Sequence, residues 1–442
     1  MIRLPHAALF VVATTTASVT PLARAVAQNP PPEAVVIGLR YDPGTKPGVL
    51  VLRVAGSSGD SIRTILQRDF DYGDRINVIA PDETGIPDTP TAGRNGNYPL
   101  YARLGAHALV QATPTASGLH VAVHNVADAK VARVKDFTLD GAPNSREWRM
   151  SLHAISDELE TWIHGVRGAA ATRIAYVQGV RGSRLYVIDS DGAFPTAVGD
   201  DVGALSPAWH PKGTHIAYSV LGARGCCQIT IFDFTSGASR QIAAVGMGLN
   251  TTPVFSPEGS VIVYTHGEDN GTDLFATTVF ERGPARRITV GRGTDNTSPT
   301  FSPDGRRLAF TTGRLGHPEI YISDADGTNA QLLTSFNFGD QNYRSSPDWS
   351  PDGRLIAFQA LQKDGQFQLN TISLRDKSVK QLTSDGSNEE VSWAPDSRHL
   401  IFSSTRAGSK QLWVLDSESC RWRQLTRNGG VRLPAWSPPL TR

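Results

Sequence analysis

The chain has 442 residues, of which 39% are hydrophobic and 19% are charged, a composition typical of globular proteins with room for two or three domains. Its 43 basic and 42 acidic side chains leave a formal net charge of +1. That balance argues against nucleic acid as the main partner, because such proteins carry an excess of basic side chains. Three cysteines, Cys226, Cys227 and Cys420, are too few to hold a fold of this size together by disulfides.

The N-terminal segment has the pattern of a secretory signal. Arg3 provides a positive charge, residues 7–19 are apolar or small and uncharged, and residues 23–27 place small side chains at alternate positions. The apolar stretch spans about 13 residues, whereas a membrane-spanning helix needs about 20. We therefore predict a cleaved signal peptide over residues 1–27; an uncleaved anchor is the alternative. The mature protein is expected to be exported and not inserted in a membrane.

A repeated segment of the form P-x-[FW]-S-P-D-G predicts the architecture of the larger part of the chain. Its second proline recurs with steps of 46, 46, 48, 44 and 43 residues, at Pro211, Pro257, Pro303, Pro351, Pro395 and Pro438. Ser-Pro-Asp-Gly suits a type I turn, and each copy is followed by short apolar strands. A period in the forties is typical of one four-stranded propeller blade.

The two ends of this region complement each other. The sixth copy contains only a first strand, around Trp436, whereas the strands at 173–177 and 184–189 lack one. Pairing them completes a blade and removes the open edge of the ring. We predict a mostly β fold with a six-bladed β-propeller over residues 170–442, in which Trp436 lies beside residues 174–177.

Residues 28–165 contain no copy of the repeat and predict a small α/β domain. The apolar patterns predict strands at 34–38, 48–52, 108–111, 119–123 and 131–139. Helices are expected after a cap at Ser57 or Ser58, after Pro99, and over 148–163, where apolar residues recur at helical spacing. Residues 81–97 are rich in turn-forming residues and predict a loop.

The order of signal peptide, α/β domain and six repeats resembles the TolB family of the Tol–Pal cell-envelope system. Similar stretches are residues 65–70, 104–110, 172–177 and 434–438. The resemblance implies a monomeric periplasmic scaffold without cofactors that supports envelope integrity, cell division and protein import. It also implies that the propeller channel end binds a Pal-type lipoprotein. The mature N-terminal segment, with Gln28, Glu33 and Val35, would bind a TolA-type inner-membrane protein as an added strand.

Motifs for catalysis are missing from the sequence. It contains neither G-x-S-x-G nor H-E-x-x-H. His120 and His124 could share one strand face as a metal pair, although a solvated face is the simpler interpretation. Asp189 and Asp191 mimic the start of a calcium loop but read as turn residues. We expect no enzyme, no metal and no cofactor. The alternatives are a propeller hydrolase or lyase with a channel metal, or a TolB-like sensor or carbohydrate-binding propeller.

The segments just before each inner strand are expected to gather at the mouth of the channel. They combine amides, hydroxyls, an aromatic ring and charges of both signs, which suits protein recognition. The candidate partner-binding residues are Asn250, Thr251, Asp295, Asn296, Thr297, Tyr343, Arg344, Asn388, Glu389, Glu390 and Arg432. Glu389 and Glu390 could also attract a cation.

Overall fold

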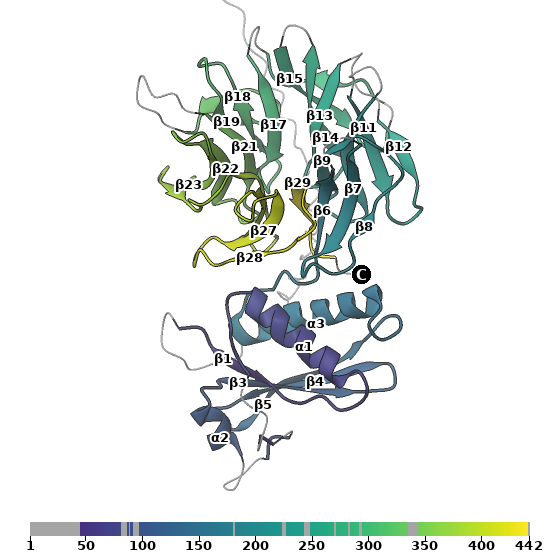
Figure 1. Cartoon of the computed structure of the whole chain (residues 1–442), viewed down its shortest axis with the longest axis vertical. Helices are drawn as coiled ribbons and strands as arrows, with labels where there is room; N and C mark the ends of the chain where they lie inside the picture. The colour runs from purple at the N-terminus through teal and green to yellow at the C-terminus, as the bar shows by residue number, and fades with distance from the viewer. Residues whose placement is uncertain are drawn as a thin grey trace, which may run out of the picture. The chain divides into compact units, whose positions relative to one another are not determined.

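The structure is a computed structural model of the chain (Figure 1). It describes residues 45–80, 86–87, 89–91, 97–179, 182–222, 227–242, 248–268, 271–281, 283–290, 294–334 and 343–440. The predicted signal peptide, the strand at 34–38, the segment with Gln28, Glu33 and Val35, most of the loop at 81–97, and Cys226 lie outside these residues. No helix in the described part of the chain combines the length and apolar character needed to cross a bilayer.

The first domain is a five-stranded sheet with helices on both faces. The strand order is β2-β1-β3-β4-β5, with β1 parallel to β2 and β3 and the remaining pairs antiparallel. The strands are β1 Gly48–Val51, β2 Asn77–Ile79, β3 Ala108–Pro114, β4 Gly118–Asn125 and β5 Lys130–Thr138. Helices α1 Gly59–Tyr72 and α3 Arg146–His164 cover the face nearer the propeller, and α2 Tyr98–Arg103 lies on the other (Figure 1).

The helices form where apolar residues recur three or four positions apart. In α1 and α3 these residues pack on the sheet as one core that includes Ile62, Leu66, Leu152 and Leu159. The hydroxyl of Ser145 accepts a hydrogen bond from the Trp148 N–H at 3.2 Å and begins α3. The sequence predicted α1 and α3 and the apolar face of each. The predicted cap of α1 is wrong in one respect, since the Ser58 side chain makes no capping hydrogen bond.

Within the described residues the second domain consists of six four-stranded units, each paired as an antiparallel meander. The first two are β9 Ala204–Trp209, β10 His215–Leu221, β11 Cys227–Asp233 and β12 Ser239–Gln241, then β13 Leu249–Phe255, β14 Val261–Glu268, β15 Gly271–Thr278 and β16 Arg286–Arg287. A single pairing of β11 with β13 joins these two.

The next three units follow the same plan. They are β17 Asn296–Phe301, β18 Arg307–Thr312, β19 Glu319–Asp324 and β20 Gln331–Leu332; β21 Arg344–Trp349, β22 Leu355–Leu361, β23 Phe367–Ser373 and β24 Val379–Gln381; and β25 Asn388–Trp393, β26 His399–Ser404, β27 Gln411–Asp416 and β28 Trp422–Gln424. The sequence repeat therefore predicted the strand order of each blade.

The sixth blade is assembled from segments far apart in the chain. Its order is β29-β6-β7-β8, formed by β29 Val431–Trp436, β6 Arg173–Gln178, β7 Arg184–Asp189 and β8 Thr196–Ala197. Trp436 pairs with Ile174, and its indole Nε1–H donates to Thr172 Oγ1 at 2.8 Å. The predicted closure of the ring is confirmed, and the strand and the indole together fix it.

Replacing Trp436 tests how much this closure stabilises the propeller. Trp436 is 8% exposed and packs with Ile174 and Val414. We expect Trp436→Ala to lower the free energy of unfolding by about 3–5 kcal/mol, measured by urea denaturation. The matched control is Trp422→Ala on the outer strand β28, where the side chain is 50% exposed and the expected loss is about 1 kcal/mol. Equal losses for the two variants would contradict a special role for Trp436.

Candidate functional site at the channel mouth

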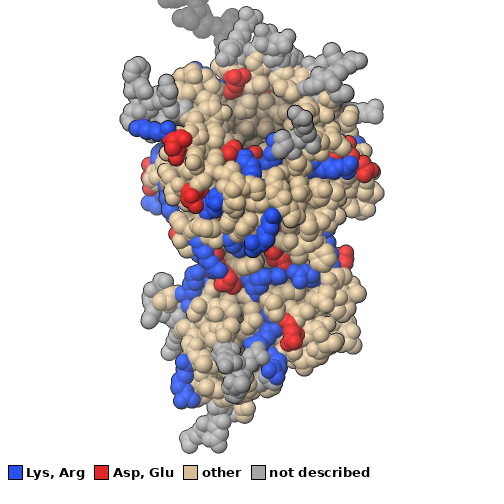
Figure 2. Space-filling model, viewed as in Figure 1, with Lys and Arg blue, Asp and Glu red and all other residues tan. Residues whose placement is uncertain are grey.

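The six inner strands enclose a cavity of about 300 Å³ at the centre of the propeller. Each inner strand contributes the same run of positions, so the lining repeats around the ring. The lining segments are residues 206–209, 252–254, 298–300, 346–348, 390–392 and 433–436, with Pro438. In the space-filling view the propeller is hollowed at its centre, and acidic and basic side chains lie near the edge of the hollow (Figure 2).

One residue of each inner strand has a left-handed backbone. These residues have φ between 47° and 60° and are Ser206, Thr252, Ser298, Ser346, Glu390 and Leu433. The pairing with the second strand shifts register at this point in every blade. A non-glycine residue in this conformation costs about 1–3 kcal/mol, so surrounding contacts must hold it.

The neighbouring blade supplies those contacts. The Ser298 N–H donates to Thr265 Oγ1 at 3.3 Å, and the Ser346 N–H donates to Thr311 Oγ1 at 3.1 Å. In both pairs the acceptor lies on the second strand of the preceding blade. The hydrogen bonds therefore fix the lining of the channel and join adjacent blades at the same time.

The two ends of the channel differ. The turn after β25 carries Asp396, and Arg398 follows it; both contact the first domain, through Arg75 and Asp74 respectively. The inner strands therefore end on the side of α1 and α3 and begin on the opposite side (Figure 1). All the predicted mouth residues lie at or just before the beginnings of inner strands. The mouth is thus the end of the channel away from the first domain.

Three of the predicted mouth residues do not present their side chains to a partner. Asn250, Asn296 and Asn388 are each 0% exposed, which corrects their expected place on the recognition surface. Each amide donates to the third strand of the preceding blade: to the Cys227 carbonyl at 2.9 Å, to Asp273 Oδ1 at 3.0 Å and to Gln368 Oε1 at 2.8 Å. These asparagines hold blades together, a role that a repeat read one blade at a time does not reveal.

The remaining mouth residues are at least partly accessible. Tyr343 is 40% exposed and Asp295 is also exposed. Arg344 donates to the buried carboxylate of Glu319 at 3.1 Å. Half-buried side chains complete the set, namely Thr251, Thr297, Arg344, Glu389, Glu390 and Arg432. The accessible surface is therefore polar, carries both signs of charge and includes one aromatic ring.

Glu390 lies in the channel but its carboxylate already has partners. It accepts hydrogen bonds from Ser403 Oγ and from the Leu433 N–H, both at 2.7 Å. The Lys410 ammonium lies 3.3 Å from Glu389 and 3.9 Å from Glu390. Glu390 thus performs the blade-joining role that a hydroxyl performs in other blades, and a lysine neighbours both acidic residues.

Asp348 is a channel residue that the sequence interpretation missed. Its carboxylate accepts hydrogen bonds from the Trp393 N–H at 2.7 Å and from Thr300 Oγ1 at 3.3 Å. Burial raises the pKa of Asp348 to about 6, against the lowering effect of these hydrogen bonds. A comparison of the six repeats could have found it, because the other blades carry Ala, Val, Thr or Ser at this position.

The raised pKa of Asp348 predicts a pH-dependent effect on stability. A carboxyl that binds its proton more tightly in the folded state stabilises the protein while it is protonated, and this stabilisation is lost as the pH rises from about 4 through 6. We expect Asp348→Asn to remove this loss, so that its unfolding free energy relative to wild type rises by about 2 kcal/mol between pH 4 and pH 7. Urea denaturation across this range measures it. A difference between the two proteins that stays constant with pH would contradict the prediction.

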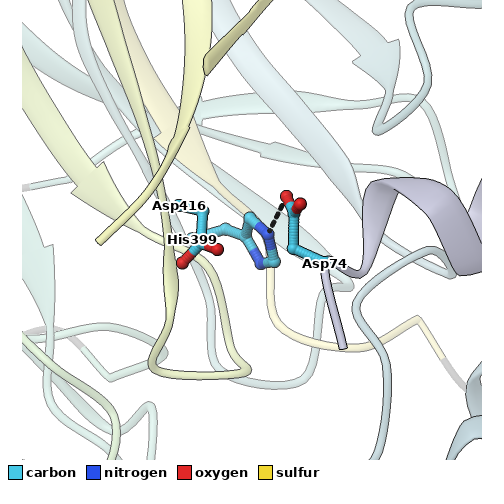
Figure 3. A group of neighbouring side chains, drawn as sticks. All are labelled: Asp74, His399 and Asp416. Carbon is cyan, nitrogen blue, oxygen red and sulfur yellow. Dashed lines mark hydrogen bonds and ion pairs between the residues drawn. The ribbon is translucent and has the colours of Figure 1, made fainter. Parts of the chain in front are cut away.

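A second cluster, where the two domains meet, has the residue types of a metal site. Asp74, His399 and Asp416 place one ligand atom each within 4.8 Å of one another (Figure 3). Yet His399 Nδ1 lies 2.7 Å from Asp396 and its Nε2 lies 3.3 Å from Asp74, while Asp416 accepts from Arg398 at 2.6 Å. These partners favour a proton on His399 over a metal ion bound to the cluster.

The electrostatics of this cluster agree with its hydrogen bonds. Burial lowers the pKa of His399, but Asp396 and Asp74 outweigh it and raise the pKa to about 9. The arginines at positions 398 and 421 neutralise Asp416 and Asp74. A metal ion would have to displace a tightly held proton beside two guanidinium groups, so the donor set fits a charged imidazole.

The histidines of β4 do not form a pair. His124 lies on the same face as His120 but is only 4% exposed, because Tyr98 of α2 covers it, with Tyr98 Oη 2.8 Å from His124 Nδ1. His120 stays on the surface, 2.6 Å from Asp136. The expected solvated face is therefore wrong for His124, because α2 covers its part of the face through Tyr98.

Known proteins share the propeller described above. Residues 161–440 match the family described as the TolB beta propeller domain. The chain belongs to this family. Its curated relatives include the Tol–Pal system protein TolB of Escherichia fergusonii, 29% identical over 220 residues that cover 48% of this chain and 50% of the relative. The TolB of Sodalis glossinidius is 31% identical over 197 residues, 43% and 45% of the two chains. The chain spans about half the length of the curated TolB relatives it matches.

Solved structures agree on the architecture. The TolB of Acinetobacter baumannii has a TM-score of 0.75 and 23% identity, with 89% of this chain and 97% of that chain covered. The hydrazine synthase of Kuenenia stuttgartiensis is more distant, with a TM-score of 0.51, 16% identity, and 61% and 47% of the two chains covered. At these identities the likeness shows the fold alone. The protein is a TolB-like propeller with an N-terminal α/β domain.

Proposed function

We propose that this TolB-like protein is a periplasmic scaffold of a Tol–Pal system. It binds a Pal-type lipoprotein at the channel mouth and a TolA-type inner-membrane protein through residues 28–36, and it performs no covalent chemistry. The observation that carries the proposal is the accessible mouth surface around the cavity, together with the name of the curated relatives, Tol–Pal system protein TolB.

The chemistry of the mouth supports binding of a protein. Side chains of both signs lie around a concave centre, and Arg344 is held by the buried Glu319 before any partner arrives. A charged side chain that is already ordered loses less conformational freedom on binding. The exposed ring of Tyr343, which packs edge-on against Phe367, is a rigid aromatic of the kind that often dominates interface energies.

The mouth can be tested against a matched position on the propeller. We expect Tyr343→Ala combined with Asp295→Lys to weaken binding of the Pal-type lipoprotein from the same cell envelope by about 10- to 100-fold. Isothermal titration calorimetry with the purified soluble domain of that lipoprotein measures this. The loss follows from removing an aromatic contact and reversing a charge on the accessible surface.

The control is Arg354→Glu, a charge reversal in the turn between β21 and β22, where the side chain is 84% exposed. This turn lies at the other end of the channel, so affinity should remain that of wild type. Equal loss in both variants, or undiminished binding by the mouth variant, would contradict the proposed docking surface. Absence of binding by the wild-type protein would favour a sensor or carbohydrate-binding propeller outside a Tol–Pal system.

Deletion of residues 28–36 tests the second partner separately. We expect it to abolish binding to the TolA-type protein, because an added strand contributes its affinity through main-chain hydrogen bonds. Pull-down with the purified TolA-type domain measures this, and thermal unfolding shows that the propeller remains folded. Retention of wild-type affinity in the deletion variant would remove residues 28–36 from the proposal.

A further inference from the structure

Two buried histidines each lie between a carboxylate of the α/β domain and a carboxylate of the propeller. His153 on α3 is 0% exposed; its Nδ1 lies 2.8 Å from Asp69 on α1, and its Nε2 lies 3.6 Å from Asp191 in the turn between β7 and β8. One carboxylate therefore belongs to its own domain and the other belongs to the propeller.

His399 on β26 reverses this arrangement. Its Nδ1 lies 2.7 Å from Asp396 of the propeller, and its Nε2 lies 3.3 Å from Asp74, which follows α1 in the α/β domain (Figure 3). The side chains of His399, Asp396 and Asp74 are all at most 8% exposed. Each histidine thus bridges one carboxylate of each domain, at two separate points of one interface.

Other charged groups face these histidines from every packed element. They include Arg68 and Arg149, which pair with Asp191; Arg75 and Glu160, which lie near Asp396; and Arg398 and Arg421, which neutralise Asp416 and Asp74. The arginines keep their charge at all relevant pH values. Lys46 also pairs with Asp74. The groups at this interface whose charge changes near and above neutral pH therefore include the histidines, Glu160 and Asp157, whose pKa is raised by burial to about 7.

We propose that His153 and His399 form a protonation-dependent latch between the α/β domain and the propeller, closed while both imidazoles are charged and loosened when they lose their protons. A charged imidazole has two N–H donors and can serve two carboxylates, whereas a neutral imidazole has one. At His399, loss of the proton leaves one carboxylate without its donor. At both histidines it removes the cation that lies between two buried carboxylates.

The direction of the pH effect follows from the same contacts. Burial lowers the pKa of both histidines, but the carboxylates outweigh it, raising the pKa of His153 above its usual range and that of His399 to about 9. A raised histidine pKa gives stability that is complete below about pH 6.5 and is lost as the pH rises through about 9. Burial and Asp396 raise the pKa of Glu160 to about 8, so its ionisation acts in the same direction.

Hydrogen exchange of the full chain in a Glu160→Gln background tests the latch without the titration of Glu160. Exchange in residues 66–76 and 393–400 is compared with exchange in β18, which reports on the propeller alone, at pH 7 and pH 9.5 after correction for intrinsic rates. We expect interface protection to fall by at least about tenfold relative to β18 at the higher pH. His399→Gln should show that loss already at pH 7 and a shallower pH dependence.

The control is His120→Gln, which removes a histidine paired with Asp136 on the exposed face of the sheet and should behave as its parent. If His399→Gln fails to fold, Asp74→Asn carries the test; Asn tolerates the left-handed backbone of Asp74, at φ 55°. Asp74→Asn should reduce interface protection at pH 7 by a similar factor. Interface protection that follows β18 up to pH 9.5, or an unaltered pH dependence in either variant, would overturn the latch.

Discussion

The propeller depends on hydrogen bonds that cross from one blade to the next at its inner strands. Every inner strand contains a residue with a left-handed backbone, which is unfavourable alone. In three blades this residue donates its N–H to a second-strand side chain of the preceding blade, as Glu390 does to Gln359 Oε1 at 2.8 Å, and Leu433 donates to Glu390 of the preceding blade. The unfavourable backbone conformation and the hydrogen bond that stabilises it thus belong to different blades. The lining of the channel is therefore stable only in the assembled ring.

The contact between the two domains follows a different physical rule. It relies on buried ion pairs more than on an apolar seam, with Asp191 between Arg68 and Arg149 and with Arg423 over the ring of Tyr72 at 4.0 Å. Removing charges from water costs more than an isolated pair returns, so such an interface needs nearly complete pairing. A contact of this kind responds to a change of one proton, whereas an apolar contact does not.

The sequence predicted the features that repeat or alternate. The period of the turns gave six blades and their strand order, and helical spacing located α1 and α3. The partner of β6 could also be predicted, because one blade lacked a strand and β29 was left over. These features depend on residues close in sequence, or on counting, and the physics of turns and amphipathic elements is sufficient for them.

The candidate site was harder to predict because its burial is decided by residues far away in the chain. Asn296 reads as a polar residue at a strand start, yet Asp273 of the preceding blade covers it. Asp348 differs from its counterparts by one carboxylate, and His124 is covered by Tyr98 of α2, which lies 26 positions away in the chain. The partner-binding role of the accessible mouth residues, such as Tyr343 and Asp295, stays a prediction.

The pairing of β29 with β6 also constrains the order in which the protein can fold. Trp436 and Thr172, joined through the indole, are 264 positions apart. Contacts of such separation form late, since the entropy of closing the intervening loop is lost before they form. The edge of β6 that pairs with β29 therefore stays unpaired until the other five blades and β29 have been synthesised. An exposed strand edge can pair with another chain, so this interval is the stage of folding at which aggregation is most favoured.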